Sequence, residues 1–236
     1  MIETKQASTD SAAVRAIETA RLLVLGYMAP VLFHEISNVL TVVSGIRQTC
    51  FRDDGEPAPG KVLAKVPHMI DEQARKSEAL YETFKRLAPR PAQEKPCTTL
   101  SAVADEIESF LELRVRGRRV KIARKSEGAD RALGAERAHR IKIVALCLAF
   151  ASLDPVIRGH QPADVSITTR TAAGAAPELW IEYRIRAARD LPPEHALELD
   201  DPTLQLCRGL LATEGACELR LQSAAGSIRV RFDRVD

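Results

Sequence analysis

The chain has 236 residues, of which 45% are hydrophobic and 28% are charged, and its formal net charge is +2. This length and composition support two ordinary globular domains. The nearly balanced charge argues against a general nucleic-acid binder. Residues Met1 to Asp10 are polar and acidic, which excludes a secretory signal peptide, and no apolar run reaches about 18 residues. We therefore expect a cytoplasmic protein with no membrane contact.

Apolar periodicity predicts a long first helix. Its apolar residues recur at alternating spacings of about three and four, close to the roughly 3.5-residue period of packed bundles. The predicted packing seam consists of Leu25, Met28, Leu32, Ile36, Val39, Val43 and Ile46. Pro30 removes one backbone hydrogen bond, so we expect the helix to bend there.

The segment Phe33-His34-Glu35-Ile36-Ser37-Asn38-Val39-Leu40-Thr41 carries the chemistry of this helix. Residues four apart share a helix face, so His34 and Asn38 project together while Glu35 flanks them. This arrangement places a carboxylate and a carboxamide next to a nucleophilic imidazole. His34 lies between two seam positions and points elsewhere, on a polar and small face that continues through Thr41, Gly45 and Gln48.

A second helical stretch follows a loop rich in glycine and proline at residues 53–60. Its apolar stripe consists of Val62, Val66, Ile70, Leu80, Phe84 and Leu87. Two long helices joined by a short loop form an antiparallel hairpin. Because a lone hairpin leaves its seam in water, we predict a homodimer in which two hairpins form a four-helix bundle.

Prolines 89, 91 and 96 mark a boundary between a hairpin domain at residues 1–90 and a second domain at residues 97–236. Beyond the boundary the pattern predicts an α+β fold, with a mixed sheet covered on one face by helices. The expected helices are one beginning near Leu100, one at Ala135–Leu153 and one at Pro202–Thr213. The expected strands are Arg119–Arg124, Val165–Thr169, Leu179–Ile185, Cys217–Gln222 and Ser227–Phe232.

Neither cysteine nor histidine spacing predicts a metal site. The five cysteines, Cys50, Cys97, Cys147, Cys207 and Cys217, are interpreted as reduced and mostly buried. We interpret Trp180 as a core or sheet-packing residue.

The segment Phe33 to Thr41 resembles the phosphoacceptor box of sensor histidine kinases, in which a His-Glu pair is followed by Asn, often Pro, and Leu. Val39 stands where that proline is frequent. The order of elements after the boundary is similar to that of the kinase ATP-binding domain. This resemblance implies a dimeric phosphoacceptor hairpin followed by an α/β sandwich.

The residues that bind nucleotide in that family are missing here. Ile143–Ala151 contains no asparagine to hold magnesium, and Ala187–Leu191 replaces the family's Asp-x-Gly-x-Gly turn. Glycine is also absent from Asp200–Leu204, where the family has a glycine-rich lid. Close approach to phosphate requires glycine and chelation requires an oxygen ligand. We therefore expect no cofactor on this chain.

A phosphoacceptor hairpin joined to a degenerate ATP-binding domain is similar to the histidine phosphotransferases of bacterial phosphorelays, including the ChpT type. This resemblance implies that His34 takes a phosphoryl group from a receiver aspartate of one response regulator and passes it to another. Glu35 orients the imidazole, and Asn38 positions the phosphoryl group or a water. Mg²⁺ is expected in the partner receiver domain. The residues expected to contact the regulator are Thr41, Val42, Gly45, Ile46 and Arg47.

Three alternatives stay open at this point. The first is a divergent but active kinase. The second is a regulator phosphatase, which the Glu-x-x-Asn spacing of Glu35 and Asn38 suggests. The third is a non-catalytic adaptor. A basic run at Arg114, Arg116, Arg118 and Arg119 either attracts an acidic regulator or is a solvated face.

Overall fold

The structure is a computed structural model, and it describes residues 2–50, 60–88, 97–171, 178–186, 202–212, 217–222 and 225–231. The chain divides into two compact units. Met28–Ala88 forms the hairpin unit, and Met1–Tyr27 together with Pro89–Asp236 forms the C-terminal unit. The sequence prediction placed residues 1–90 in one domain, whereas here the first 27 residues group with the C-terminal half.

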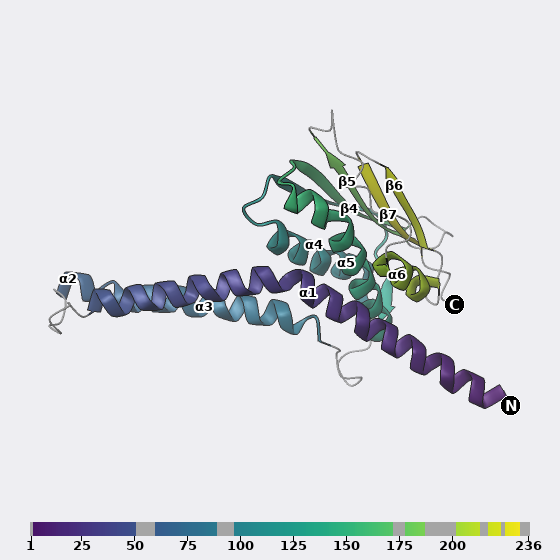
Figure 1. Cartoon of the computed structure of the whole chain (residues 1–236), viewed down its shortest axis with the longest axis horizontal. Coiled ribbons are helices and arrows are strands. Elements are labelled where there is room, and N and C mark those ends of the chain that lie inside the picture. The colour runs from purple at the N-terminus through teal and green to yellow at the C-terminus, as the bar shows by residue number, and fades with distance from the viewer. Residues whose placement is uncertain are drawn as a thin grey trace. The chain divides into compact units, whose positions relative to one another are not determined.

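The hairpin unit consists of the second half of α1 (Ile2–Cys50), the short α2 (Gly60–Leu63) and α3 (Val66–Lys85). Figure 1 shows α1 and α3 side by side. α1 continues through Pro30 without interruption. The prediction of one continuous second helix was wrong, because Pro67 stands in the first turn of α3 and supplies no backbone N–H.

The predicted seam of α1 divides into two neighbouring stripes. Met28 and Ile46 are buried, with 0% and 8% of their surface exposed. Ile36 and Val43 are 42% and 51% exposed, although the sequence places them in the same seam. A straight helix has about 3.6 residues per turn, whereas the apolar pattern repeats about every 3.5 residues. The apolar positions therefore shift gradually around the helix, and no single neighbouring helix covers all of them.

One stretch of the described chain, Val14–Cys50, is long and apolar enough to cross a membrane by length and composition alone. The most apolar window of this helix has a mean hydropathy of 1.5 and is 17% buried. This result differs from the expectation that no apolar run is long enough, because an average tolerates the charged residues that interrupt a continuous run. A core helix of a soluble protein passes the same test.

The C-terminal unit is an α+β sandwich. Its elements are β1 (Cys97–Thr99), α4 (Leu100–Val115), β2 (Val120–Gly128), β3 (Ala132–Gly134), α5 (Ala135–Arg158), β4 (Ala163–Thr171), β5 (Glu178–Ile185), α6 (Pro202–Ala212), β6 (Cys217–Gln222) and β7 (Ala225–Arg231). Five strands pair in the order β2-β4-β5-β7-β6, and only the β2–β4 pair is parallel. Helices α4, α5 and α6 lie on one face of this sheet (Figure 1). The predicted mixed sheet with one covered face is therefore confirmed.

The core of this unit lies between α5 and the sheet. Strand residues alternate between the two faces, so every second side chain of β4 and β5 points toward the helices. Most of those that do so are buried and aliphatic, as Val165, Ile167, Leu179 and Ile181 show. The short β1–β3 ribbon was not predicted, because three-residue strands are too short to show an alternating pattern.

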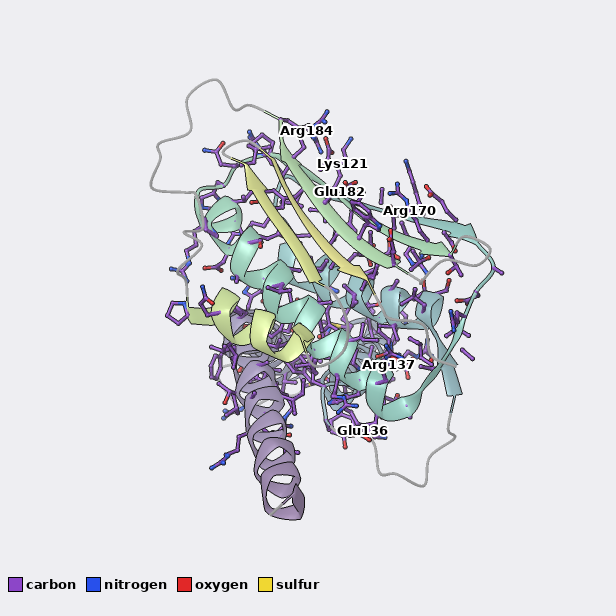
Figure 2. All side chains as sticks on the ribbon, turned by 90° about the vertical axis from the view of Figure 1, so that its right-hand side faces the viewer. Lys121, Glu136, Arg137, Arg170, Glu182 and Arg184 are labelled. Carbon is purple, nitrogen blue, oxygen red and sulfur yellow. The ribbon has the colours of Figure 1, made fainter. Side chains whose placement is uncertain are left out.

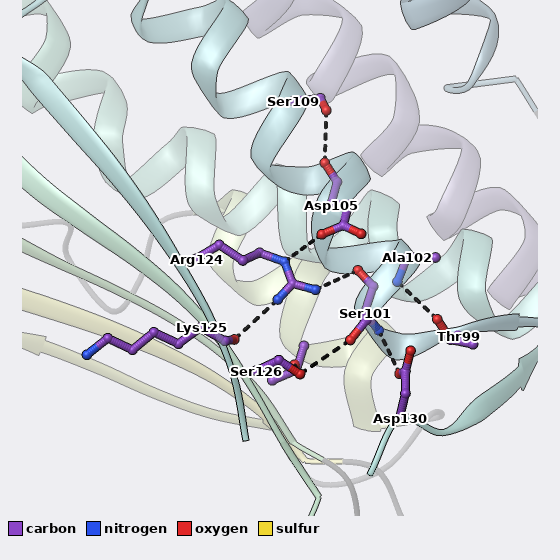
Figure 3. Close-up of polar contacts among 10 residues, drawn as sticks. Thr99, Ser101, Ala102, Asp105, Ser109, Arg124, Lys125, Ser126 and Asp130 are labelled. Atoms are coloured by element: carbon purple, nitrogen blue, oxygen red, sulfur yellow. Dashed lines mark hydrogen bonds and ion pairs between the residues drawn. The ribbon is translucent and has the colours of Figure 1, made fainter. Parts of the chain in front are cut away.

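Polar contacts fix the start of α4, as Figure 3 shows. The Thr99 hydroxyl caps the helix by accepting the N–H of Ala102 at 3.2 Å. Asp130 Oδ1 accepts the N–H of Ser101 at 3.1 Å. Burial raises the pKa of the Asp130 carboxyl, but hydrogen bonds from the Thr99 hydroxyl and from two backbone N–H groups outweigh burial and lower it. These contacts are made by charged and polar groups at a helix end, and they hold α4 in place above the sheet.

Arg124 joins the same end of α4 to the edge strand β2 (Figure 3). Its guanidinium donates to the Asp105 carboxylate at 2.8 Å and to the Ser101 carbonyl at 2.8 Å. The side chain of Asp105 is 67% exposed and that of Arg124 only 15% exposed. Arg124 is thus the more buried member of the pair, and its hydrogen bonds link β2 to α4.

Candidate functional site

The predicted nucleophile, His34, is exposed on α1 within the hairpin unit. At about 100° per residue, Asn38 lies about 40° and Thr41 about 20° around the helix from His34. Both are exposed as well. The Thr41 hydroxyl donates to the Ser37 carbonyl at 2.8 Å, so it rests against its own helix. The structure therefore brings together His34, Asn38 and Thr41 on one accessible face.

Glu35 lies about 100° from His34 around the helix and is half-buried. It occupies the side of α1 that carries the buried Met28 and Ile46, each about 120° from His34. A carboxylate next to the nucleophile in sequence is thus held toward the helix packing rather than toward open solvent. In that position the Glu35 carboxylate is suited to restrain the side chain of its neighbour His34.

The five predicted regulator contacts do not share one face. Gly45 lies about 20° from His34 and Val42 about 80° away. Ile46 is only 8% exposed and offers a partner little surface. Arg47 lies about 140° from His34 in the other direction, so the helix does not bring it to the predicted site. Sequence spacing suggested a docking surface, but only Thr41, Val42 and Gly45 lie near the nucleophile.

An exposed apolar stripe runs along the opposite side of α1. It is formed by Ile36, Leu40 and Val43, which are 42%, 61% and 51% exposed and lie about 160°, 120° and 180° around the helix from His34. Tyr81 of α3 adds to the stripe and is 65% exposed. Between α1 and α3 the stripe opens into a groove of about 390 Å³. The groove is lined by Leu32, Ile36, Val39, Leu40, Ser77, Leu80, Tyr81 and Phe84.

In the C-terminal unit, the middle of α5 is enclosed on every side. Each residue from Ile141 to Leu153 is at most 4% exposed. The polar atoms of this stretch are also enclosed: Lys142 Nζ lies 2.6 Å from Glu106 Oε2, and Ser152 Oγ is buried without a hydrogen-bond partner. No side-chain oxygen of this stretch reaches an open surface. Ala187–Leu191 and Asp200–Asp201, where the family's nucleotide-binding turn and lid are expected, lie outside the described residues.

The chain matches no protein-family model and no curated protein. Solved structures of histidine kinases do resemble it. The catalytic domain of histidine kinase ThkA is 14% identical and has a TM-score of 0.44, with 58% of this chain and 94% of that chain covered. A histidine kinase from Burkholderia phymatum is 13% identical with a TM-score of 0.42, covering 94% of this chain and 97% of that chain.

ThkA in complex with the response regulator TrrA also resembles this chain, at 15% identity and a TM-score of 0.43, covering 90% of this chain and 63% of that chain.

Two ion pairs between α4 and α5 were missed by the sequence reasoning. Lys142 is paired with Glu106, and Asp154 is held 2.6 Å from Arg114 and 2.5 Å from Arg158. A lysine about two turns and an aspartate about five turns along an apolar helix give a sequence signal for such pairs, but their partners are about 40 residues away. Among the described residues, no group of three or more His, Cys, Asp or Glu is placed to hold a metal ion.

Trp180 packs on the sheet and not in the core, which is the second of the two roles predicted for it. It is half-buried on the face of the sheet that lies away from the helices. The Arg170 guanidinium stacks over the indole at 4.8 Å, and the indole N–H donates to Glu178 at 2.9 Å. On this exposed face the indole contacts Arg170 and Glu178, whereas a core tryptophan would contact aliphatic side chains.

Proposed function

We propose that this protein is a histidine phosphotransferase of a two-component phosphorelay, which moves a phosphoryl group between response regulators through His34. The observation that carries the proposal is an exposed imidazole in a His-Glu-x-x-Asn segment, with Asn38 beside it on the same face. Exposure matters because the donor phosphate is covalently attached to a second protein. A buried histidine would not meet it.

The proposed reaction needs little from the phosphotransferase beyond alignment. The lone pair of a neutral His34 ring nitrogen attacks the phosphorus of a receiver aspartyl phosphate, and the P–O bond to the aspartate breaks. The aspartate leaves as a carboxylate, and a phosphoramidate N–P bond forms on His34. The half-buried Glu35 stabilises the cationic ring, and Asn38 orients the phosphoryl oxygens. Transfer to a second receiver reverses these steps.

We further propose that the protein works as a homodimer. The apolar stripe of Ile36, Leu40 and Val43 lies on the side of α1 away from His34, and 61% of the Leu40 surface would otherwise stay in water. A second hairpin laid on this stripe completes a four-helix bundle. His34, Asn38 and Thr41 stay accessible in such a dimer. Covering the stripe by protein also accounts for the apolar length of α1 in a cytoplasmic protein.

We propose that this chain obtains phosphate from a regulator and not from ATP. Burial of every residue from Ile141 to Leu153 supports this, because a nucleotide bound on α5 needs an open helix face with an oxygen ligand for magnesium. The metal ion that assists the reaction is then the one in the receiver's own acidic pocket.

The proposal predicts that a phosphorylated receiver domain labels the wild-type protein and does not label His34→Gln. Glutamine keeps the size and polarity of the side chain but lacks a nucleophilic nitrogen, so labelling should fall by roughly 1000-fold or more. The measurement mixes the full chain with receiver domains that carry radioactive aspartyl phosphate and resolves the proteins on a gel.

The matched control is His68→Gln, which removes the other exposed histidine of the hairpin unit, on α3. It should be labelled like the wild type. Labelling of His34→Gln at the wild-type rate would refute the proposal, and so would equal losses in both variants.

A further inference from the structure

Cationic side chains gather at the edge of the C-terminal unit where β2 and β4 begin and β5 ends. Three segments meet there, Arg116–Lys121, Arg158–Asp164 and Arg184–Arg186, and we call them the basic end. They carry seven arginines and lysines and one carboxylate, that of Asp164. The net charge of the three segments is therefore about +6, with Asp154 outside them paired to Arg158, while the whole chain carries +2.

Backbone hydrogen bonds lock the three segments together. The N–H of Ala163 donates to the Arg119 carbonyl at 3.1 Å, and the N–H of Arg186 donates to the Pro162 carbonyl at 2.8 Å. An apolar cluster of Val156, Ala163 and Ile185 packs beneath them. The cations therefore stand on a rigid base, which lowers the entropy lost when they bind a partner.

Gly117 permits the tight turn that presents two of these arginines. Its φ of +73° lies in the left-handed region, and the N–H of Arg118 donates to the Val115 carbonyl at 2.8 Å across the turn. Arg118 and Arg119 are both exposed beyond it. The Arg118 guanidinium lies 2.9 Å from His160 Nδ1 and must be the donor, because it has no acceptor atom. This contact orients the guanidinium and leaves its charge intact.

We propose that the basic end binds a carboxylate-rich surface of a partner protein. The planar guanidinium matches a carboxylate in a two-point contact. The chain itself shows this chemistry at the same place, since Arg186 holds the Asp164 carboxylate at 2.6 Å. The proposal does not depend on phosphoryl transfer by His34.

A nucleic acid fits this surface less well. The basic end is short, and acids stand next to it on the outer face of the sheet, where Figure 2 shows Glu182 projecting from the same side as Lys121 and Arg184. With +2 on the chain and +6 on the basic end, the remaining residues carry about −4 and repel a long polyanion. The described residues of the basic end include no Phe, Tyr or Trp on which a base could stack, and their one aromatic ring, the imidazole of His160, is in contact with the Arg118 guanidinium.

The chain's own residues 187–201 are the competing occupant. They directly follow Arg186 and contain five carboxylates and one arginine. These residues lie outside the described part of the chain, and the experiment below distinguishes them from a partner protein as the occupant of the basic end.

The test measures binding of a fluorescent ten-residue glutamate peptide to the full-length protein by anisotropy at low and physiological salt. Arg119→Glu should weaken binding roughly threefold to tenfold, because it reverses one charge at the basic end. Lys125→Glu is the matched control, since it makes the same charge change at an exposed position near the other end of β2. It should change the affinity less than about twofold. Melting curves establish that both variants are folded.

Equal effects of Arg119→Glu and Lys125→Glu would overturn the proposal, because binding would then follow overall charge. Tighter binding of a DNA duplex than of the peptide under the same salt conditions would overturn it in favour of a nucleic-acid partner. If the wild type binds no peptide, and binding appears only after the five acids of residues 187–201 are replaced by amides, the surface belongs to the chain's own segment and the proposal fails.

Discussion

Exchange of Leu40 for glutamate is expected to convert the protein from a dimer to a monomer at micromolar concentration. Leu40 is 61% exposed in the single chain, in the apolar stripe with Ile36 and Val43. In a symmetric dimer the substitution places two carboxylates in an apolar interface, where neither finds a partner. We expect the dissociation constant to rise by about 100-fold or more, as two unpaired buried charges require.

The measurement is the molar mass in solution by light scattering over a range of concentrations. Gln48→Glu is the matched control, because Gln48 is exposed on the His34 side of α1 and the change introduces the same carboxylate. It should stay dimeric. A monomeric wild type, or a Leu40→Glu variant that still dimerises like Gln48→Glu, would show that the stripe is not the dimer interface.

Removal of the Glu106 carboxylate is expected to destabilise the C-terminal unit strongly. The Lys142 side chain is 4% exposed, and its ammonium lies 2.6 Å from Glu106. Glu106→Ala leaves a charge in the interior without this partner, and such losses cost about 3 kcal/mol or more of unfolding free energy. Urea unfolding followed by the fluorescence of Trp180, the single tryptophan of the chain, reports on the same unit.

The double variant Glu106→Leu with Lys142→Met should recover most of the lost stability, since it replaces both charges by apolar groups of similar size. Glu136→Ala is the control for an exposed pair, because Glu136 is 84% exposed and 3.5 Å from Arg140. It should cost less than about 0.5 kcal/mol. If Glu106→Ala costs no more than Glu136→Ala, the pair does not carry the packing of α4 on α5.

The sequence was sufficient for features that are encoded locally. The alternation of β4 and β5 and the apolar length of α5 predicted a mixed sheet with one covered face, and the structure has it. The position of His34 between seam residues predicted a histidine that avoids the packed side of α1, and it is exposed. Each of these predictions depends only on the spacing of apolar residues within a single helix or strand.

Features that depend on distant partners could not be predicted. Lys142 and Asp154 are ordinary charged residues in sequence, and only packing against α4 brings them to Glu106 and Arg114. Ile36 and Ile46 have the same apolar character, but they lie about 80° apart around α1 and differ in exposure, with 42% of Ile36 and 8% of Ile46 exposed. Arg47 was grouped with the regulator contacts by its place in the sequence, although helix rotation turns it away from His34.

The comparison of two phosphate donors tests the central claim most directly. The full-length protein is incubated either with a phosphorylated receiver domain or with γ-labelled ATP and Mg²⁺, and the label on His34 is measured by its loss in acid and its survival in base. We predict rapid labelling by the receiver domain and none by ATP. Labelling by ATP in the absence of any other protein, or no labelling from any phosphorylated receiver, would contradict a phosphotransferase that relies on its partners for phosphate.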